Sequence, residues 1–149
     1  DIPLATAKMV EDFINACRET EADVYYSMVE RSLNEKKYPG MKRTYIKLRE
    51  GTYTGGNVVL LNPEVLRKQW GTIEQAMALR KSPLKLLGMM GFVFILKFLF
   101  KKLSRDEIEK KAGSILGFRV KAVEVADPEI GIDVDKESDY LLVKEKLGL

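Results

Sequence analysis

The 149-residue chain has 46% hydrophobic and 32% charged residues, which is the composition of a folded globular domain and not of a disordered segment. Its net charge of +3 is too small to favour nucleic acid, so we expect no nucleic-acid partner. A single cysteine and no histidine exclude an internal disulfide, histidine-based triads and histidine-ligated zinc.

The first third of the chain predicts a helix followed by two strands. Residues 7–19 place apolar side chains at helical spacing after Thr6, which is a suitable N-cap, and Cys17 lies on the apolar face as a structural thiol. Residues 23–31 and 43–48 are rich in β-branched and aromatic side chains and predict strands. The lysine-rich residues 34–42 contain a Pro-Gly pair and predict an exposed loop between them.

The middle of the chain predicts a glycine-rich turn, a buried strand and a helix. The apolar run at residues 58–61 is typical of a strand covered on both faces, and Asn62 and Pro63 then suit a helix start. Capping-box patterns at residues 72–75 and 104–107 predict two further helix starts.

The last third predicts a strand at residues 118–125 and a closing helix. Tyr140, Val143 and Leu147 give that helix one apolar edge. Because helices and strands alternate, the predicted fold class is α/β with a covered sheet. Ligands bind such sheets at the carboxyl ends of strands, so acids and glycines in the neighbouring turns are the candidate site residues.

Three segments together resemble the MobA-like nucleotidyltransferases, within the nucleotide-diphospho-sugar transferase fold. Residues 1–6, DIPLAT, look like the family's Gly-Asp-x-Pro-Leu turn without its glycine. Residues 133–142, DVDKESDYLL, are similar to its Asp-x-Asp-Thr-Pro-Glu-Asp-Leu segment, with Lys-Glu-Ser in place of Thr-Pro-Glu. Residues 38–63 resemble the family's middle segment, in which a Gly-Gly-Asn turn lies on the acceptor side.

The resemblance implies a Rossmann-like covered mixed sheet of the nucleotide-diphospho-sugar transferase type, incomplete at its N-terminus. Residues 1–149 would form a single partial domain with an apolar helical insertion around 84–103. The implied reaction is Mg²⁺-dependent transfer of a nucleotide from a nucleoside triphosphate to a phosphorylated small-molecule acceptor, with release of pyrophosphate. No glycine-rich loop here follows a strand and opens a helix, so we expect this chain alone to lack nucleotide affinity and activity.

The candidate metal ligands are three aspartates. By resemblance Asp1 and Asp135 would hold Mg²⁺, with Asp133 as an alternative or supporting ligand, because Mg²⁺ is usually held by one or two carboxylates together with substrate phosphates. Asp135 has a second interpretation as the N-cap of the last helix, and we expect Asp139 to be an exposed helix residue.

The candidate substrate-binding residues are Gly55, Gly56, Asn57 and Arg43. The two glycines would let an acceptor approach the backbone, the Asn57 amide would bond to it, and Arg43 would meet phosphate. The alternative is that residues 55–57 only form a turn that enters a buried strand.

Residues 84–100 are apolar nearly all round, and bases lie before and after them. The uncharged part, Leu86 to Leu96, is shorter than the roughly 20 residues that cross a bilayer. This segment fits a core or lid helix, a contact between identical subunits, or a helix that docks on an anionic membrane surface.

Two other functions remain open from the sequence: a non-catalytic interaction or membrane-docking module, and a metal-dependent glycosyltransferase of related fold. These residues contain no secretion-signal pattern, so we expect a cytoplasmic protein, peripheral to the membrane if the apolar segment docks there.

Overall fold

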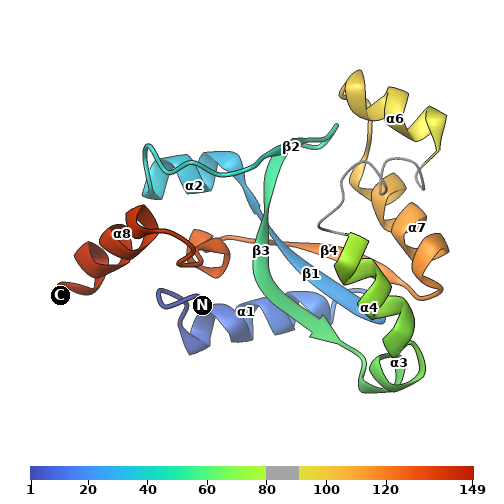
Figure 1. Cartoon of the computed structure of the whole chain (residues 1–149), viewed down its shortest axis with the longest axis horizontal. Coiled ribbons are helices and arrows are strands. Elements are labelled where there is room, and N and C mark those ends of the chain that lie inside the picture. The colour runs from blue at the N-terminus through green and yellow to red at the C-terminus, as the bar shows by residue number, and fades with distance from the viewer. Residues whose placement is uncertain (80–90) are drawn as a thin grey trace.

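The structure is a computed structural model that describes residues 1–79 and 91–149 (Figure 1). Within these residues, four strands form one mixed sheet in the order β2-β3-β1-β4. Strand β1 lies antiparallel to β3 and parallel to β4, and β2 lies antiparallel to β3. The strands are β1 (Val24–Glu30), β2 (Ile46–Lys47), β3 (Thr52–Leu61) and β4 (Val120–Val125).

Helices separate β1 from β2 and β3 from β4, whereas β2 and β3 follow each other directly, and this mixture agrees with the predicted α/β class. Thr6, Asn62 and Ser104 accept hydrogen bonds from the first backbone amides of α1, α3 and α7, as the capping patterns predict. The described helices are α1 (Ala7–Cys17), α2 (Arg31–Lys37), α3 (Pro63–Lys68), α4 (Trp70–Leu79), α6 (Phe92–Leu99), α7 (Arg105–Leu116), the 3₁₀ helix η1 (Pro128–Gly131) and α8 (Glu137–Leu147).

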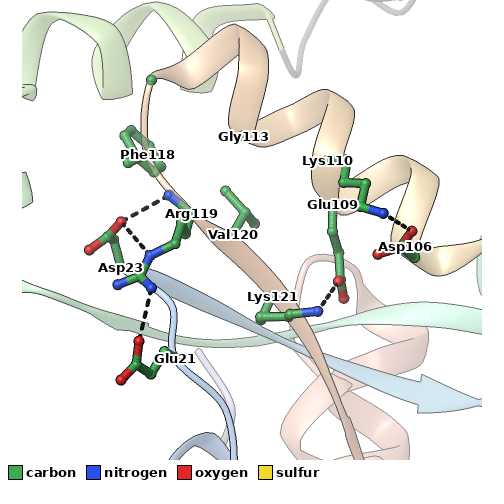
Figure 2. Close-up of a pocket in the computed structure, with 11 residues that line it drawn as sticks. Glu21, Asp23, Asp106, Glu109, Lys110, Gly113, Phe118, Arg119, Val120 and Lys121 are labelled. Carbon is green, nitrogen blue, oxygen red and sulfur yellow. Dashed lines mark hydrogen bonds and ion pairs between the residues drawn. The ribbon is translucent and has the colours of Figure 1, made fainter.

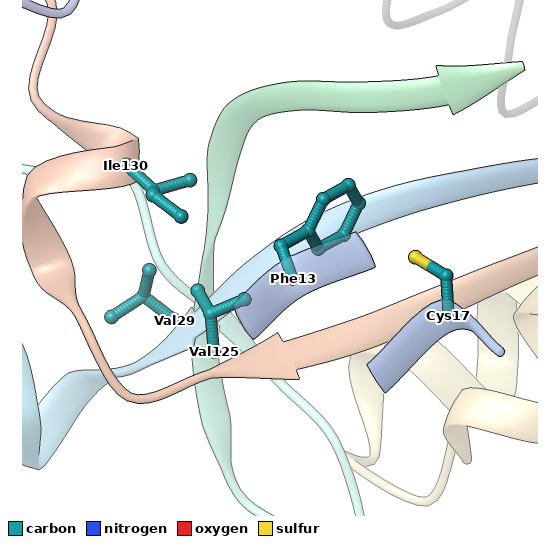
Figure 3. Packing of buried hydrophobic residues seen from close by; sticks show 5 residues of the cluster. All are labelled: Phe13, Cys17, Val29, Val125 and Ile130. Atoms are coloured by element: carbon teal, nitrogen blue, oxygen red, sulfur yellow. The ribbon is translucent and has the colours of Figure 1, made fainter. Parts of the chain in front are cut away.

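One face of the sheet packs on α1 (Figure 3). Phe13 and Cys17 of α1 form a buried cluster there with Val29 of β1, Val125 of β4 and Ile130 of η1. Burial raises the pKa of the Cys17 thiol and so keeps it in the unreactive protonated form. The position of Cys17 is that of a core residue, as predicted.

The opposite face of the sheet packs on α6 and α7. Met28 of β1 lies on this face, next to Val29 on the other, because side chains alternate along a strand. Met28 is buried with Tyr53 and Leu103, and Phe94 of α6 packs against this cluster. The sheet is therefore covered by helices on both of its faces.

A third, smaller cluster joins segments that are far apart in the sequence. Tyr38, Ile132 and Val143 are its buried members, and Leu4 and Met41 pack against them. The cluster connects the N-terminal turn, the loop after α2, the segment after η1 and helix α8. These are the segments that carry most of the candidate site residues.

Two predictions for the first half of the chain are wrong. Residues 34–37 belong to α2 and not to a loop, because Leu33 packs on the core and Asn34 is buried against Tyr45. Of the predicted strand 43–48, only Ile46–Lys47 is paired, at the outer edge of the sheet.

The glycine pair lies inside β3 and not in a turn before it. A Cβ on Gly56 would lie 2.2 Å from Ser27 Oγ on the neighbouring strand, so glycine is what allows β3 and β1 to pair there. The apolar run at residues 58–61 was predicted to be buried on both faces, but Val59 is exposed.

Four expectations about the later helices are also corrected. Helix α4 begins at Trp70, so Thr72 lies inside it and bonds to Gln69 instead of capping it. The N-cap of α8 is Lys136 and not Asp135, and its amide donates to the Asp139 carboxylate, which is therefore a capping group and not a free surface residue. The predicted apolar edge of α8 is buried only at Val143, since Tyr140 and Leu147 are exposed.

The predicted apolar insertion is described only from residue 91 onward, where α6 forms. Residues 84–90 lie outside the described part of the chain. Among the described residues, no helix is long and apolar enough to cross a membrane.

Candidate functional site

A pocket of about 270 Å³ collects four of the candidate site residues. Arg43, Asn57, Asp133 and Asp135 all line it. They come from the loop after α2, from strand β3 and from the segment that follows η1. This segment lies beyond the carboxyl end of β4, where α/β sheets bind ligands. We call this cavity the site pocket.

The Arg43 side chain bonds to two segments that line the site pocket, the segment after η1 and strand β3. Its Nη1 atom lies 3.1 Å from Asp133 Oδ1, and its Nη2 atom donates to the Gly55 carbonyl oxygen at 3.2 Å. The Arg43 side chain is only 17% exposed, so both bonds form in a partly desolvated environment. The guanidinium thus holds the segment after η1, which carries Asp133, against strand β3.

Asp133 is held in its charged form. Burial raises the pKa of its carboxyl, but hydrogen bonds from its own backbone amide, from Arg43 and from Asn57 outweigh burial and set the pKa below its usual value. At neutral pH this carboxylate is therefore fully ionised. It can accept hydrogen bonds or bind a cation.

Asn57 of β3 bonds to the 3₁₀ helix η1, which packs closely against this strand. Its amide nitrogen donates to the Gly131 carbonyl oxygen at 3.3 Å. A Cβ on Gly131 would lie 3.2 Å from Arg43 Nη2 and 3.3 Å from the Gly55 carbonyl oxygen, so glycine lets η1 approach the strand closely. Gly55 and Gly56 therefore contribute to the site by allowing close packing, and the Gly55 carbonyl oxygen also accepts the bond from Arg43.

The backbone of the N-terminal turn contacts the segment that carries Asp133 and Asp135. The carbonyl oxygen of Asp1 accepts a hydrogen bond from the amide of Val134 at 3.2 Å, and Val134 lies between Asp133 and Asp135. The backbone of the N-terminal turn is therefore joined to the segment that carries Asp133 and Asp135. Asp135 lines the site pocket, whereas Asp1 is exposed and does not line it.

A buried polar pair supports the loop that carries Arg43. Tyr38 Oη donates to Glu129 Oε1 at 2.5 Å, and Lys37 Nζ lies 2.6 Å from the same oxygen. Burial raises the pKa of the Glu129 carboxyl, but the bonds from Lys37 and Tyr38 outweigh burial and lower it. Glu129 thus anchors the start of the loop to η1.

Sequence reasoning missed several residues of the site. Lys136 lines the site pocket in the segment where the sequence departs from the family pattern, and Thr44 and Thr54 add hydroxyl groups. Tyr38 is buried next to a Pro-Gly pair, and it was missed because residues 34–42 were predicted as an exposed loop. A second pocket of about 530 Å³ adjoins the first, since Lys42, Lys136 and Asp139 line both.

The residues around the site pocket offer hard oxygen ligands and cations. The carboxylates of Asp133 and Asp135 and the Asn57 amide oxygen are of the type that Mg²⁺ prefers, so the donor set fits that ion. Within residues 1–79 and 91–149, no group of three or more acidic or thiol side chains is placed so that it could hold a metal ion. A metal here would need oxygens from a bound phosphate or from water.

A larger pocket of about 580 Å³ lies elsewhere, between α7 and the ends of β1 and β4 (Figure 2). Its charges pair with one another: Arg119 with Glu21 at 3.2 Å, and Lys121 with Glu109 at 2.7 Å. None of the candidate site residues lines it. Because its acids and bases are already paired, this pocket is a weaker candidate for ligand chemistry.

Comparison with known proteins gives one solved structure of high similarity. It is described as a hypothetical transferase from Thermus thermophilus, and it matches 93% of this chain at 40% identity with a TM-score of 0.85. The two proteins therefore share a fold over most of this chain, which spans 59% of the length of that chain. No protein-family model and no curated protein matches this chain.

Proposed function

We propose that this chain belongs to a transferase, and that the site pocket forms the metal and acceptor side of a nucleotidyl-transfer site. The transferase class is supported by the similarity to the Thermus thermophilus protein described as a hypothetical transferase. The observation that carries the finer proposal is the gathering of Arg43, Asn57, Asp133 and Asp135 around one pocket beyond the carboxyl end of β4.

The reaction needs alignment and charge neutralisation more than acid–base chemistry. A phosphate oxygen of the acceptor attacks the α-phosphorus of a nucleoside triphosphate, a new P–O–P linkage forms, and the bond to the β-phosphate breaks to release pyrophosphate. When bound, Mg²⁺ would neutralise charge on the phosphate oxygens. The nucleotide-holding residues are proposed to lie outside residues 1–149.

The residues of this chain divide into three roles. Asp133 and Asp135 would hold the ion together with oxygens of a bound phosphate or of water. Asn57 would bond to the acceptor, and Lys136 would attract its phosphate group. Arg43 would act as a positioning residue, because both its Nη atoms already bond to the protein.

The experiment is a pyrophosphate-release assay on the full-length natural polypeptide that contains residues 1–149. Each ribonucleoside triphosphate is offered with a set of sugar phosphates and alcohol phosphates, with and without Mg²⁺. We expect Mg²⁺-dependent release that Asp135→Asn lowers by about tenfold or more. Asp12→Asn is the matched control, since Asp12 is exposed on α1 and pairs with the exposed Lys8 of the same helix.

The same assay separates the two other functions. A metal-dependent glycosyltransferase would release no pyrophosphate and would instead release a nucleoside diphosphate from a nucleotide sugar. A non-catalytic module would give neither product, and its aspartate variants would behave like the wild type. Either outcome would overturn the proposal of nucleotidyl transfer.

A further inference from the structure

Helix α6 presents an apolar face to solvent. Val93, Leu96 and Leu99 lie three residues apart, and Phe100 follows at the helix end, so these four side chains share one side of the helix. Val93 is 67% exposed, Leu99 65% and Phe100 69%. We call these four residues the α6 face.

Other side chains of α6 attach the helix to the domain. Phe94 contacts the cluster of Met28, Tyr53 and Leu103, and Lys97 pairs with Glu107 of α7. In Figure 1, α6 lies beside α7 at the upper right, and α8 lies at the opposite side of the view. The helix is therefore fixed to the domain by one edge, and its other edge points outward with large apolar side chains.

Basic side chains lie next to the α6 face. Residues 91–105 contain four basic residues (Lys97, Lys101, Lys102, Arg105) and no acidic residue. Lys97 and Arg105 pair with Glu107 and Glu124, whereas Lys101 and Lys102 are exposed directly after Phe100. An exposed apolar face beside exposed positive charge is complementary to a surface that is apolar inside and negative outside.

We propose that the α6 face, together with Lys101 and Lys102, docks this domain on an anionic lipid bilayer. Helix α6 would lie in the headgroup plane, with Leu99 and Phe100 inserted among the acyl chains and the two lysines on lipid phosphates. Eight residues of helix measure about 12 Å, too short to cross a hydrocarbon core of about 30 Å, so the contact is interfacial. This surface contact goes beyond the proposed reaction and does not depend on it.

The first experiment measures co-sedimentation of the chain with vesicles. Vesicles of phosphatidylcholine alone are compared with vesicles in which part of that lipid is replaced by phosphatidylglycerol. We expect binding only to the anionic vesicles, and weaker binding as salt is raised, because screening shortens the reach of the lysines. Lys101→Glu with Lys102→Glu should lower the partition coefficient by about tenfold or more.

A second pair of variants tests the apolar contribution. Leu99→Ser with Phe100→Ser should abolish sedimentation with anionic vesicles. The matched control is Leu147→Ser with Leu149→Ser, which removes two exposed leucines beside Lys144 and Lys146 at the C-terminus. Far-UV circular dichroism establishes that each variant is folded, and the control variant should bind like the wild type.

Three results would overturn the proposal. One is absent or equal binding to neutral and anionic vesicles. Another is binding that the α6 variants leave unchanged. The third is a dimer in analytical ultracentrifugation that Leu99→Ser with Phe100→Ser dissociates while vesicle binding is absent, which would assign the α6 face to a second copy of this chain.

Discussion

Arg43 and Asp133 are separated by 90 positions in the sequence, yet Arg43 Nη1 lies 3.1 Å from Asp133 Oδ1. Through its second nitrogen the same guanidinium also donates to the Gly55 carbonyl oxygen. The Arg43 side chain therefore holds the segment after η1 against strand β3, and both of these segments line the site pocket. The function of the site pocket should be sensitive to this side chain even though it is not expected to touch the reacting atoms.

Arg43→Lys keeps the positive charge but removes the two-nitrogen fork. We expect a loss of about 1–2 kcal/mol in the free energy of unfolding, because one of the two oxygens loses its donor. Urea unfolding of the chain measures this loss. Arg67→Lys, on the exposed side of α3, should change nothing. Equal stability of Arg43→Lys and wild type would mean that the fork is not needed.

The Asp133 carboxylate should make stability depend on acid. Its folded-state pKa lies below its ordinary value of 3.8, so the unfolded chain takes up a proton first. The stabilisation is then fully present above about pH 4 and is lost as pH falls through the folded-state pKa. Asp133→Asn should destabilise the chain at neutral pH, and the difference from wild type should shrink below pH 4. Urea unfolding at stepwise lower pH measures this, and a constant difference would contradict it.

Gly56→Ala should be strongly destabilising. The added Cβ would lie 2.2 Å from Ser27 Oγ and 3.2 Å from Ile130 Cγ2, and both side chains are buried. We expect a loss of about 1–3 kcal/mol in the free energy of unfolding. Gly71→Ala is the matched control, because nothing lies within 4 Å of its Cβ and alanine favours the helix, so thermal unfolding should move to higher temperature.

Tyr38→Phe removes the hydroxyl donor from the buried Glu129 carboxylate. Lys37 still pairs with the same oxygen, so we expect a loss of about 0.5–1.5 kcal/mol in the free energy of unfolding, and thermal unfolding should occur at a lower temperature. Amide hydrogen exchange should also accelerate in residues 38–44, because this bond anchors the start of the loop that carries Arg43. Tyr140→Phe removes an exposed hydroxyl and should leave both measurements unchanged.

Local signals in the sequence predicted the elements well where one side chain decides the backbone. Thr6, Asn62 and Ser104 each cap a helix as their patterns indicate. Thr72 has the same pattern but lies inside α4, because the chain is already helical from Trp70 onward. Capping patterns mark possible starts, and the neighbouring structure selects among them.

Long-range contacts explain what the sequence did not predict. Gly55 and Gly56 were expected in a turn, but the side chains of β1 occupy the space that a Cβ would need, and only the register of the two strands shows this. Residues 34–37 were expected in a loop, and tertiary contacts of Leu33 and Asn34 make them part of helix α2. The grouping of Arg43 with Asp133 likewise depends on packing around Tyr38 and Ile132.

The most direct test of the proposed site is a Mn²⁺ titration of the ¹⁵N-labelled chain followed by NMR, with Mn²⁺ standing in for Mg²⁺. We predict that line broadening starts at the amides of residues 54–57 and 131–136, and that Asp133→Asn with Asp135→Asn removes it. Broadening that centres on the pocket around Glu21 and Asp23, or that the double variant leaves unchanged, would contradict the assignment of the metal side of a transferase site to these residues.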